Sequence, residues 1–205
     1  HPLMTIIDTK RTNDYVNTFL SHYKYGGLLP VWELNANETF CMIGYHSVPV
    51  IVDAWVKGIK GFDGKYAFEA MKHSSNLNHL GLEAYRKYGH IPGDKEPESI
   101  SKTLEYAYDD YCINQMALKL DKPDITQEYK TRSEAYKLIF DKSTGFMRAK
   151  KSDGSFVIPF DPLSTEKQGF IEGNAWNYSL YVPHNPAHMI ELMGGKKPFI
   201  QHLDS

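Results

Sequence analysis

Helical periodicity over residues 97–120 is the feature that most restricts the fold of this chain. Large side chains recur there every three or four residues, at Ile100, Leu104, Tyr108, Tyr111, Gln115 and Leu118. The pattern ends at Lys122-Pro123, and a second helical pattern follows over residues 125–140. Because the loop between the two patterns is short, we expect an antiparallel pair of helices. The pair predicts a helical hairpin.

Other segments add to a mostly helical pattern. Ser47 is the expected N-cap of a helix whose body, residues 50–56, is apolar on nearly every side. A helix of that kind is buried all round. Further helices are expected over residues 13–25 and 64–72 and near Ala175, Pro186 and Lys197.

One short stretch favours β-structure instead. Asp153-Gly154 separates two alternating apolar runs, residues 145–150 and 156–158, which is typical of a β-hairpin. The class is therefore all-α with a small β-hairpin. Paired helices with buried inner members suit a ring of helical hairpins, and no composition break marks a domain boundary within residues 1–205.

Composition narrows the range of partners. The formal net charge is −2, so nothing indicates binding to nucleic acid or to an anionic membrane. No apolar run approaches the roughly 18 residues that span a bilayer. Aromatic residues make up 13% of the chain, which suits a carbohydrate-binding surface but also a tyrosine-rich helical core. Cys41 and Cys112 lack metal-type spacing and leave open whether they are paired.

The stretch 170–178 contains the side chains that a sugar site uses. The Glu172 carboxyl can pass a proton to a glycosidic oxygen, the Asn174 amide can hold ring hydroxyls, and a pyranose can lie on Trp176. Short motifs have weak specificity. The alternative is structural: Glu172 caps a helix whose inner face carries Trp176.

A second candidate segment, residues 32–47, opens the apolar helix. Trp32, Glu33 and His46 could line a pocket as a stacking platform, a hydroxyl acceptor and a polar contact. The alternative is a capping region with Glu33 on the surface.

Two further pairs of side chains could suggest a zinc site or paired catalytic carboxylates, but both pairs have simpler explanations. His184 and His188 have the spacing of a zinc pair, yet Pro186 between them places His184 before the helix. Asp109 and Asp110 point about 100° apart on a helix and cannot easily enter one site. We expect one of the two carboxyls to be exposed and the other partly buried.

Several ordered motifs together resemble the catalytic domain of the calcium-dependent, exo-acting α-mannosidases of glycoside hydrolase family 92. The matching stretches are residues 1–3, 29–34, 41–47, 106–110, 144–148 and 172–176, including Leu-Pro-Val-Trp-Glu-Leu, Cys-Met-Ile-Gly-Tyr-His-Ser and Glu-Gly-Asn-Ala-Trp. Agreement of several motifs in order is more specific than any one of them.

The resemblance implies a fold and a mechanism. The family fold is an (α/α)₆ barrel preceded by a β-sandwich, so residues 1–205 would form part of the barrel. Glu172 would be the general acid of an inverting reaction on mannose-containing glycans, with an α-1,2 linkage expected and Ca²⁺ as cofactor. Apolar neighbours such as Phe170, Ile171 and Trp176 could raise the pKa of Glu172, as a general acid needs.

The resemblance also marks what this stretch lacks. The family's general base and most Ca²⁺ ligands would follow Ser205, so the metal ligands stay unknown and we expect residues 1–205 alone to be inactive. Apolar helix faces left uncovered would favour self-association. The resemblance further suggests a periplasmic or secreted bacterial protein.

Two other classes of function remain open. One is a non-catalytic helical carbohydrate-binding or scaffold module, and the other is a different (α/α)-barrel sugar enzyme, such as a lyase or an epimerase. A second carboxylate opposite Glu172 would favour the hydrolase.

Overall fold

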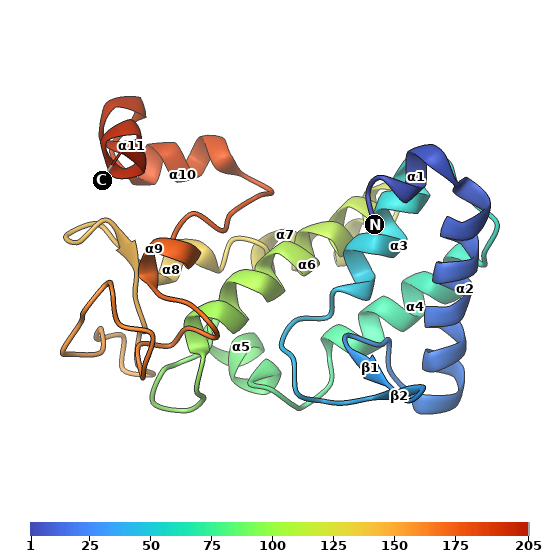
Figure 1. Cartoon of the computed structure of the whole chain (residues 1–205), viewed down its shortest axis with the longest axis horizontal. Coiled ribbons are helices and arrows are strands. Elements are labelled where there is room, and N and C mark those ends of the chain that lie inside the picture. The colour runs from blue at the N-terminus through green and yellow to red at the C-terminus, as the bar shows by residue number, and fades with distance from the viewer. Residues whose placement is uncertain (205) are drawn as a thin grey trace. The chain divides into compact units, whose positions relative to one another are not determined.

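The chain is mostly helical, as the periodicity predicts (Figure 1). The computed structural model describes residues 1–204. The helices are α1 (Met4–Ile7), α2 (Thr9–Gly26), α3 (Ser47–Val56), α4 (Gly64–Ser75), α5 (Leu82–Tyr88), α6 (Ser99–Lys119), α7 (Pro123–Arg132), α8 (Tyr136–Ile139), α9 (Ala175–Tyr178), α10 (Pro186–Leu192) and α11 (Lys196–Leu203). The strands are β1 (Glu33–Leu34), β2 (Asn37–Glu38), β3 (Phe140–Asp141) and β4 (Phe146–Met147).

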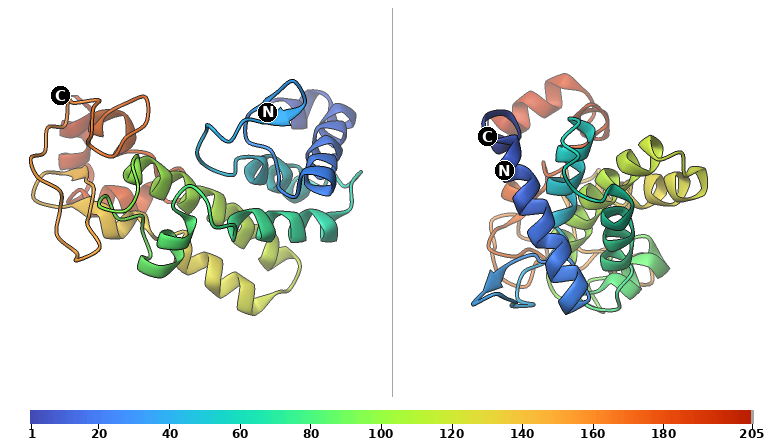
Figure 2. Two further views of the ribbon diagram at one scale, coloured as in Figure 1. Left: turned by 90° about the horizontal axis from the view of Figure 1, so that it is seen from below. Right: turned by 90° about the vertical axis from the view of Figure 1, so that its right-hand side faces the viewer.

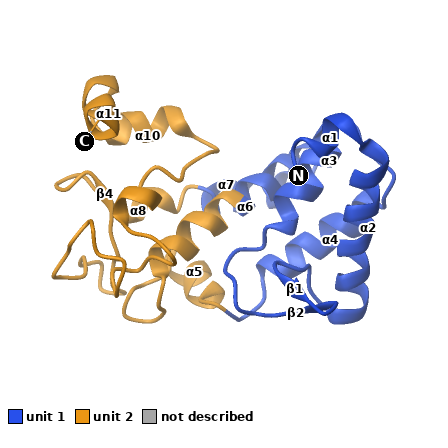
Figure 3. Ribbon diagram, in the orientation of Figure 1, with its two compact units in different colours: residues 1–79, 109–133 blue, residues 80–108, 134–205 orange. Residues whose placement is uncertain are grey.

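The chain divides into two compact units (Figure 3). Unit 1 contains residues 1–79 and 109–133, and unit 2 contains residues 80–108 and the chain from residue 134 onward. One boundary falls inside α6, between Tyr108 and Asp109. No change of composition marks these boundaries in the sequence.

Unit 1 is built on three helices, α2, α3 and α4, which contact one another (Figure 2). Helix α2 starts where the Asp8 carboxylate accepts a hydrogen bond from the Arg11 N–H at 2.9 Å. It ends at Gly27, whose φ of 84° is the left-handed conformation that glycine adopts at little cost. The Asp63 side chain caps α4 by accepting from the Lys65 and Tyr66 N–H groups. Side-chain caps thus define where two of these helices begin.

The apolar helix α3 lies in the core of unit 1. Val48, Ile51 and Ala54 are fully buried, while Val56 at its end is 46% exposed. Val50, Asp53 and Trp55 are only partly buried. The expectation of burial all round was therefore wrong: the helix has one buried face and one partly exposed face. The prediction that Ser47 is the N-cap was wrong, because Ser47 lies inside the helix and its hydroxyl donates to the Pro30 carbonyl.

Unit 2 is organised around one apolar cluster. Ile100 and Leu104 of α6 contribute to it together with Tyr136 and Ile139 of α8. The other buried members are Phe140, Phe146, Met147, Ala149, Phe170, Ala175, Val182 and Met189. Since Phe170 and Ala175 belong to it, the cluster supports both ends of the segment that carries Glu172.

Two predicted elements differ in the structure. The helical pattern over residues 125–140 is interrupted by a turn at residues 133–135, which separates α7 from α8. The predicted hairpin forms only one bridge, Lys150 with Phe156, while β4 pairs with β3. Burial of all four residues of the β3–β4 pair explains why that pairing is preferred.

Two further features are the lengths of the helices and the state of the two cysteines. Among residues 1–204, no helix is long and apolar enough to cross a membrane. Neither cysteine forms a disulfide there: Cys41 is exposed, with its sulfur 3.2 Å from the Thr39 hydroxyl, and Cys112 on α6 is 7% exposed.

Candidate functional site

The segment that carries Glu172 is tied to the first turn of α6. The Gly169 carbonyl accepts hydrogen bonds from the N–H groups of Ile100, at 2.9 Å, and Ser101, at 3.3 Å. The Ser101 hydroxyl in turn accepts from the Ile171 N–H at 3.0 Å. The first N–H groups of a helix lack partners inside the helix. The loop supplies these partners and is held in place by them.

Glu172 itself is exposed and has an unusual backbone. Its φ is 50°, in the left-handed region that non-glycine residues seldom occupy. Of its apolar neighbours in sequence, Phe170 is buried in the core and Ile171 is half-buried, whereas Glu172 is exposed. The structure therefore presents this carboxyl to solvent from a fixed backbone.

Asn174 has a structural function that the sequence left open. Its side-chain oxygen accepts from the Trp176 and Asn177 N–H groups, and the Asn177 side chain accepts from the Asn174 N–H. This reciprocal capping box starts α9. The segment does cap a helix, as the structural alternative predicted, but the capping residue is Asn174 and not Glu172.

Replacement of Asn174 separates capping from substrate contact. We expect Asn174→Ala to lower the free energy of unfolding by about 1 kcal/mol, because the cap is lost. Asn174→Asp keeps an oxygen acceptor and should retain most of that stability, as chemical denaturation would show. The Asn174 amide N–H₂ also donates to the Leu163 carbonyl at 3.3 Å. Lower activity of Asn174→Asp at unchanged stability would therefore indicate a substrate contact of the amide, and equal activity would limit Asn174 to structure.

Trp176 packs inside unit 2. Its ring stacks on His202, with ring centroids 4.6 Å apart, and meets Phe146 edge to face at 4.8 Å. Burial lowers the pKa of His202, which favours its neutral form. One face of the indole is therefore covered by a side chain of α11, so a sugar stacked on Trp176 would use the other face.

Ser101 and Glu105 of α6, which contact the segment carrying Glu172, were not predicted from the sequence. The Tyr178 hydroxyl donates to the Glu105 carboxylate at 3.2 Å. Burial raises the pKa of Tyr178 to about 12, and the charges of Glu105 and Glu172 act in the same direction, against a hydrogen bond with Ser101. Ser101 and Glu105 are four residues apart on α6 and so share a face. That spacing was the only signal of them in the sequence.

The other predicted residues lie in unit 1. Trp32 precedes β1 and is 49% exposed, and Glu33 lies exposed on β1, 3.9 Å from His22 Nε2. The β1–β2 hairpin was not predicted. The Glu38 carboxylate closes it by accepting from the N–H groups of Val31, Trp32 and Phe40. The surface placement considered for Glu33 is what the structure shows.

His46 is held by a buried carboxylate. Asp109 Oδ1 lies 2.9 Å from His46 Nδ1, and Asp109 Oδ2 accepts from the Tyr45 N–H at 2.8 Å. Asp109 is 0% exposed, whereas the His46 side chain is 37% exposed. Unit 1 thus orients one imidazole from inside the core.

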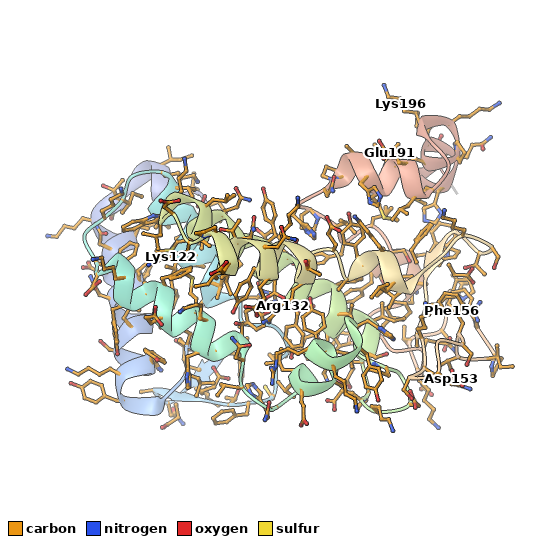
Figure 4. The ribbon with its side chains drawn as sticks, turned by 180° about the vertical axis from the view of Figure 1, so that it is seen from behind. Lys122, Arg132, Asp153, Phe156, Glu191 and Lys196 are labelled. Atoms are coloured by element: carbon orange, nitrogen blue, oxygen red, sulfur yellow. The ribbon has the colours of Figure 1, made fainter. Side chains whose placement is uncertain are left out.

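The expectation for the adjacent aspartates was wrong. Asp110 is as buried as Asp109 and accepts from the Tyr45 hydroxyl at 2.5 Å and from Arg132 Nε at 2.9 Å. Burial raises the pKa of Asp110 to about 6, although Arg132 and the Tyr45 hydroxyl oppose the rise. Figure 4 shows Arg132 at the end of α7. Arg132 and the Tyr45 hydroxyl on Asp110, and the Tyr45 N–H and the His46 ring on Asp109, allow both carboxylates to be buried.

His184 and His188 have the predicted placement, with only His188 on α10. Asn185 caps this helix and Pro186 starts it, so His184 precedes the helix. The His188 ring lies 2.9 Å from the Tyr136 hydroxyl through Nδ1, and His184 meets the Tyr136 ring edge to face. The two histidines thus pack around one buried tyrosine.

The structure distributes the predicted residues over both units. Glu172, Asn174 and Trp176 share one segment of unit 2. Unit 1 holds the other three, of which Trp32 and Glu33 are neighbours at the β1–β2 hairpin. In unit 2, an exposed carboxyl lies on an anchored loop with amide and aromatic side chains beside it, which are residue types that a glycosidase site uses.

Comparison with known proteins agrees with that class. The Glycosyl hydrolase family 92 catalytic domain matches residues 1–205, so the chain belongs to this family. The resemblance inferred from the motifs is confirmed. An "Uncharacterized secreted glycosidase" of Arthroderma benhamiae is 27% identical over 90% of this chain and 29% of its own length.

Two solved structures have the same fold. The family GH92 α-mannosidase BT3965 from Bacteroides thetaiotaomicron is 42% identical with a TM-score of 0.94, and its complex with mannoimidazole is also known. The family GH92 inverting mannosidase BT2199 from the same species is 36% identical with a TM-score of 0.95. Both similarities cover 100% of this chain. The chain spans less than a third of each relative, 28% of BT3965 and 29% of BT2199.

Proposed function

We propose that the whole protein containing this sequence is an exo-acting, inverting α-mannosidase and that Glu172 is its general acid. The observation that carries the proposal is the exposed Glu172 carboxyl on a loop fixed to α6 through Gly169 and Ile171. A proton donor must be held within hydrogen-bond reach of the leaving oxygen, and a fixed backbone provides that. The similarity to BT2199, described as an inverting mannosidase, supports the stereochemistry.

The proposed substrate is a mannose-containing glycan with a terminal α-1,2 linkage. Trp32, Glu33, His46, Asn174 and Trp176 are proposed substrate contacts. The complex of BT3965 with mannoimidazole supports a mannose-shaped site in the family. The secreted glycosidase of Arthroderma benhamiae supports a secreted location, and self-association through apolar faces stays a proposal.

Product stereochemistry tests this function directly. The whole protein is incubated with the methyl glycoside of α-1,2-mannobiose, in which the released mannose is the only sugar with a free anomeric centre, while ¹H NMR follows the anomeric protons. An inverting enzyme must first release β-mannose, because water attacks the face opposite the leaving group. α-Mannose as first product would exclude inversion. Binding of the disaccharide without any cleavage would favour a carbohydrate-binding module.

Calcium dependence is proposed for the whole protein only. Among residues 1–204, no three or more His, Cys, Asp or Glu side chains are grouped so that they could hold a metal ion. We therefore assign no calcium ligand among these residues, and no step of the proposed mechanism passes through the ion.

Removal of calcium from the whole protein provides the corresponding test. We expect treatment with a chelator to abolish most mannose release, and added Ca²⁺ to restore it better than Mg²⁺, which demands a smaller octahedral site. Chelated enzyme that retains full activity, with metal content checked by elemental analysis, would contradict the calcium proposal.

A further inference from the structure

We propose that Ser101 is a positioning residue that fixes the backbone of Glu172, so that the Glu172 carboxyl meets the leaving oxygen of the substrate, and that Tyr178 is a second fixed point of the same segment. The inference deepens the proposed function and rests on it for the role of Glu172. These residues, and the contacts that carry the argument, all lie inside unit 2.

The Ser101 hydroxyl links α6 to the residue before Glu172. Ser101 is 0% exposed, and its hydroxyl accepts from the Ile171 N–H at 3.0 Å. The Gly169 carbonyl meanwhile accepts from the backbone N–H groups of Ile100 and Ser101. The chain that leads to Glu172 is thus tied to α6 by a carbonyl and by an N–H. Only the second of these ties depends on a side chain of α6.

Tyr178 holds the same segment on the other side of Glu172. Its hydroxyl donates to the Glu105 carboxylate at 3.2 Å, and Glu105 lies one helical turn beyond Ser101 on α6. The Tyr178 ring also lies against the backbone at Gly173, where an added Cβ would be 3.3 Å from Tyr178 Cε2. The segment is therefore bound to one face of α6 both before and after Glu172.

The backbone at Glu172 explains why two such contacts are needed. Its φ of 50° lies in the left-handed region, which is unfavourable for a residue that has a Cβ. Residues in this region persist where surrounding contacts hold them, and they cluster at functional sites. A return to negative φ would turn the Glu172 carboxyl in another direction. Contacts on both sides of Glu172 retain the observed conformation and thereby the direction of the carboxyl.

Proton donation is the step that depends on this direction. In the proposed reaction Glu172 gives its proton to the glycosidic oxygen as the bond from that oxygen to the anomeric carbon breaks. Water adds to the anomeric carbon and loses a proton to the general base of the whole protein. A displacement of about 1 Å can lower the rate of such a step roughly 10²-fold. A substrate whose leaving group departs without a proton does not need the position.

Two substrates of the whole protein therefore test the inference. α-Mannosyl fluoride needs little protonation to leave, whereas α-1,2-mannobiose needs it fully. We expect Ser101→Ala to lower kcat about tenfold to a hundredfold on mannobiose and less than about twofold on the fluoride. Tyr178→Phe should show the same pattern, and it makes the test decisive even if Ser101→Ala does not fold. Equal losses on both substrates, or no loss on mannobiose, would overturn the positioning role.

Ser179→Ala is the matched control. Ser179 is also 0% exposed, and its hydroxyl also accepts a backbone N–H, that of Met147 at 2.9 Å. Its loss removes a similar hydrogen bond from unit 2 without altering the residue before Glu172. We expect Ser179→Ala to leave the ratio of the two kcat values unchanged. A ratio that falls as far as in Ser101→Ala would mean that general loosening of unit 2 explains both results, and would overturn the specific role.

A double variant shows whether Ser101 acts through Glu172. If Ser101 only positions the proton donor, its hydroxyl has no further effect once the donor is removed. Adding Ser101→Ala to Glu172→Gln should therefore change kcat for mannobiose by less than about twofold. Effects that multiply in the double variant would contradict the proposal, because Ser101 would then act independently of Glu172.

Backbone hydrogen exchange gives a measurement that does not depend on activity. In peptides that contain residues 168–175, Ser101→Ala should exchange faster than the unsubstituted protein, because the Ile171 N–H loses its partner, and Ser179→Ala should not. Unchanged exchange in Ser101→Ala would overturn the inference. If exchange becomes faster as expected but the unsubstituted protein hydrolyses no mannoside, the proposed function fails and the anchoring of this segment by Ser101 stands.

Discussion

Replacing Glu172 by glutamine in the whole protein is expected to lower kcat for α-1,2-mannobiose by roughly 10²–10⁴-fold, the usual contribution of a positioned proton donor. Glutamine has nearly the same size and cannot give a proton to the leaving oxygen. Since Glu172 is exposed, the substitution should leave the free energy of unfolding almost unchanged. Steady-state kinetics and thermal unfolding of the same preparations would check both expectations.

The leaving group distinguishes proton donation from other roles of Glu172. α-Mannosyl fluoride needs little protonation to leave, so Glu172→Gln should hydrolyse it with a much smaller loss of kcat than it shows with mannobiose. Glu166→Gln, which alters another exposed glutamate in the segment before Glu172, is the matched control and should retain activity on both substrates. Equal losses on the two substrates would exclude Glu172 as general acid.

Arg132→Met should cause the largest loss of stability that we predict. Arg132 is 10% exposed and pairs with the fully buried Asp110, and its guanidinium also donates to the Ser75 carbonyl at 3.0 Å. Removing one partner of a buried ion pair leaves an uncompensated charge, at a cost of about 3–5 kcal/mol. Urea denaturation, followed by the fluorescence of the tryptophans, would measure that cost.

The pH dependence of this cost has a definite sign. The pKa of Asp110 in the folded protein is raised to about 6 from 3.8. The stabilisation that this raised pKa gives the folded state is complete below about pH 4 and is lost as the pH rises through 6. Loss of Arg132 raises the pKa of Asp110 further. The difference between Arg132→Met and the unsubstituted protein should therefore be greatest above pH 6 and should shrink in acid.

Arg11→Met provides the comparison for that experiment. Arg11 pairs with Asp8 on the surface at 3.5 Å and is 63% exposed, and exposed pairs of this kind contribute little. A cost for Arg132→Met as small as that for Arg11→Met, or one independent of pH, would contradict the importance of the buried pair.

Local patterns predicted most of the helices correctly. Periodicity located α2, α4 and α6, and proline at the first turn located α10. These features depend on residues close together in sequence. The turn at residues 133–135 and the pairing of β3 with β4 depend on which side chains enter the core of unit 2, and local periodicity does not report that.

Among the candidate site residues, too, local motifs were predictable from the sequence and tertiary contacts were not. Glu172 was found because it lies in a motif with amides and an indole. Glu105, which accepts a hydrogen bond from Tyr178 of the same segment, lies 67 positions before Glu172 on α6 and had no motif. Burial of the Asp109–Asp110 pair was predicted wrongly because Tyr45 and Arg132, which satisfy the carboxylates, are remote in sequence. Such partners become visible only when tertiary contacts are known.

The two cysteines give this molecule built-in chemical probes of its own opening. Cys41 is exposed beside the β1–β2 hairpin, so a thiol reagent should label it at once in the native state. Cys112 is 7% exposed on α6 and should react only when that part of the helix opens. The ratio of the two labelling rates would therefore report the local opening free energy of the helix that also carries Asp109 and Asp110, without any engineered site.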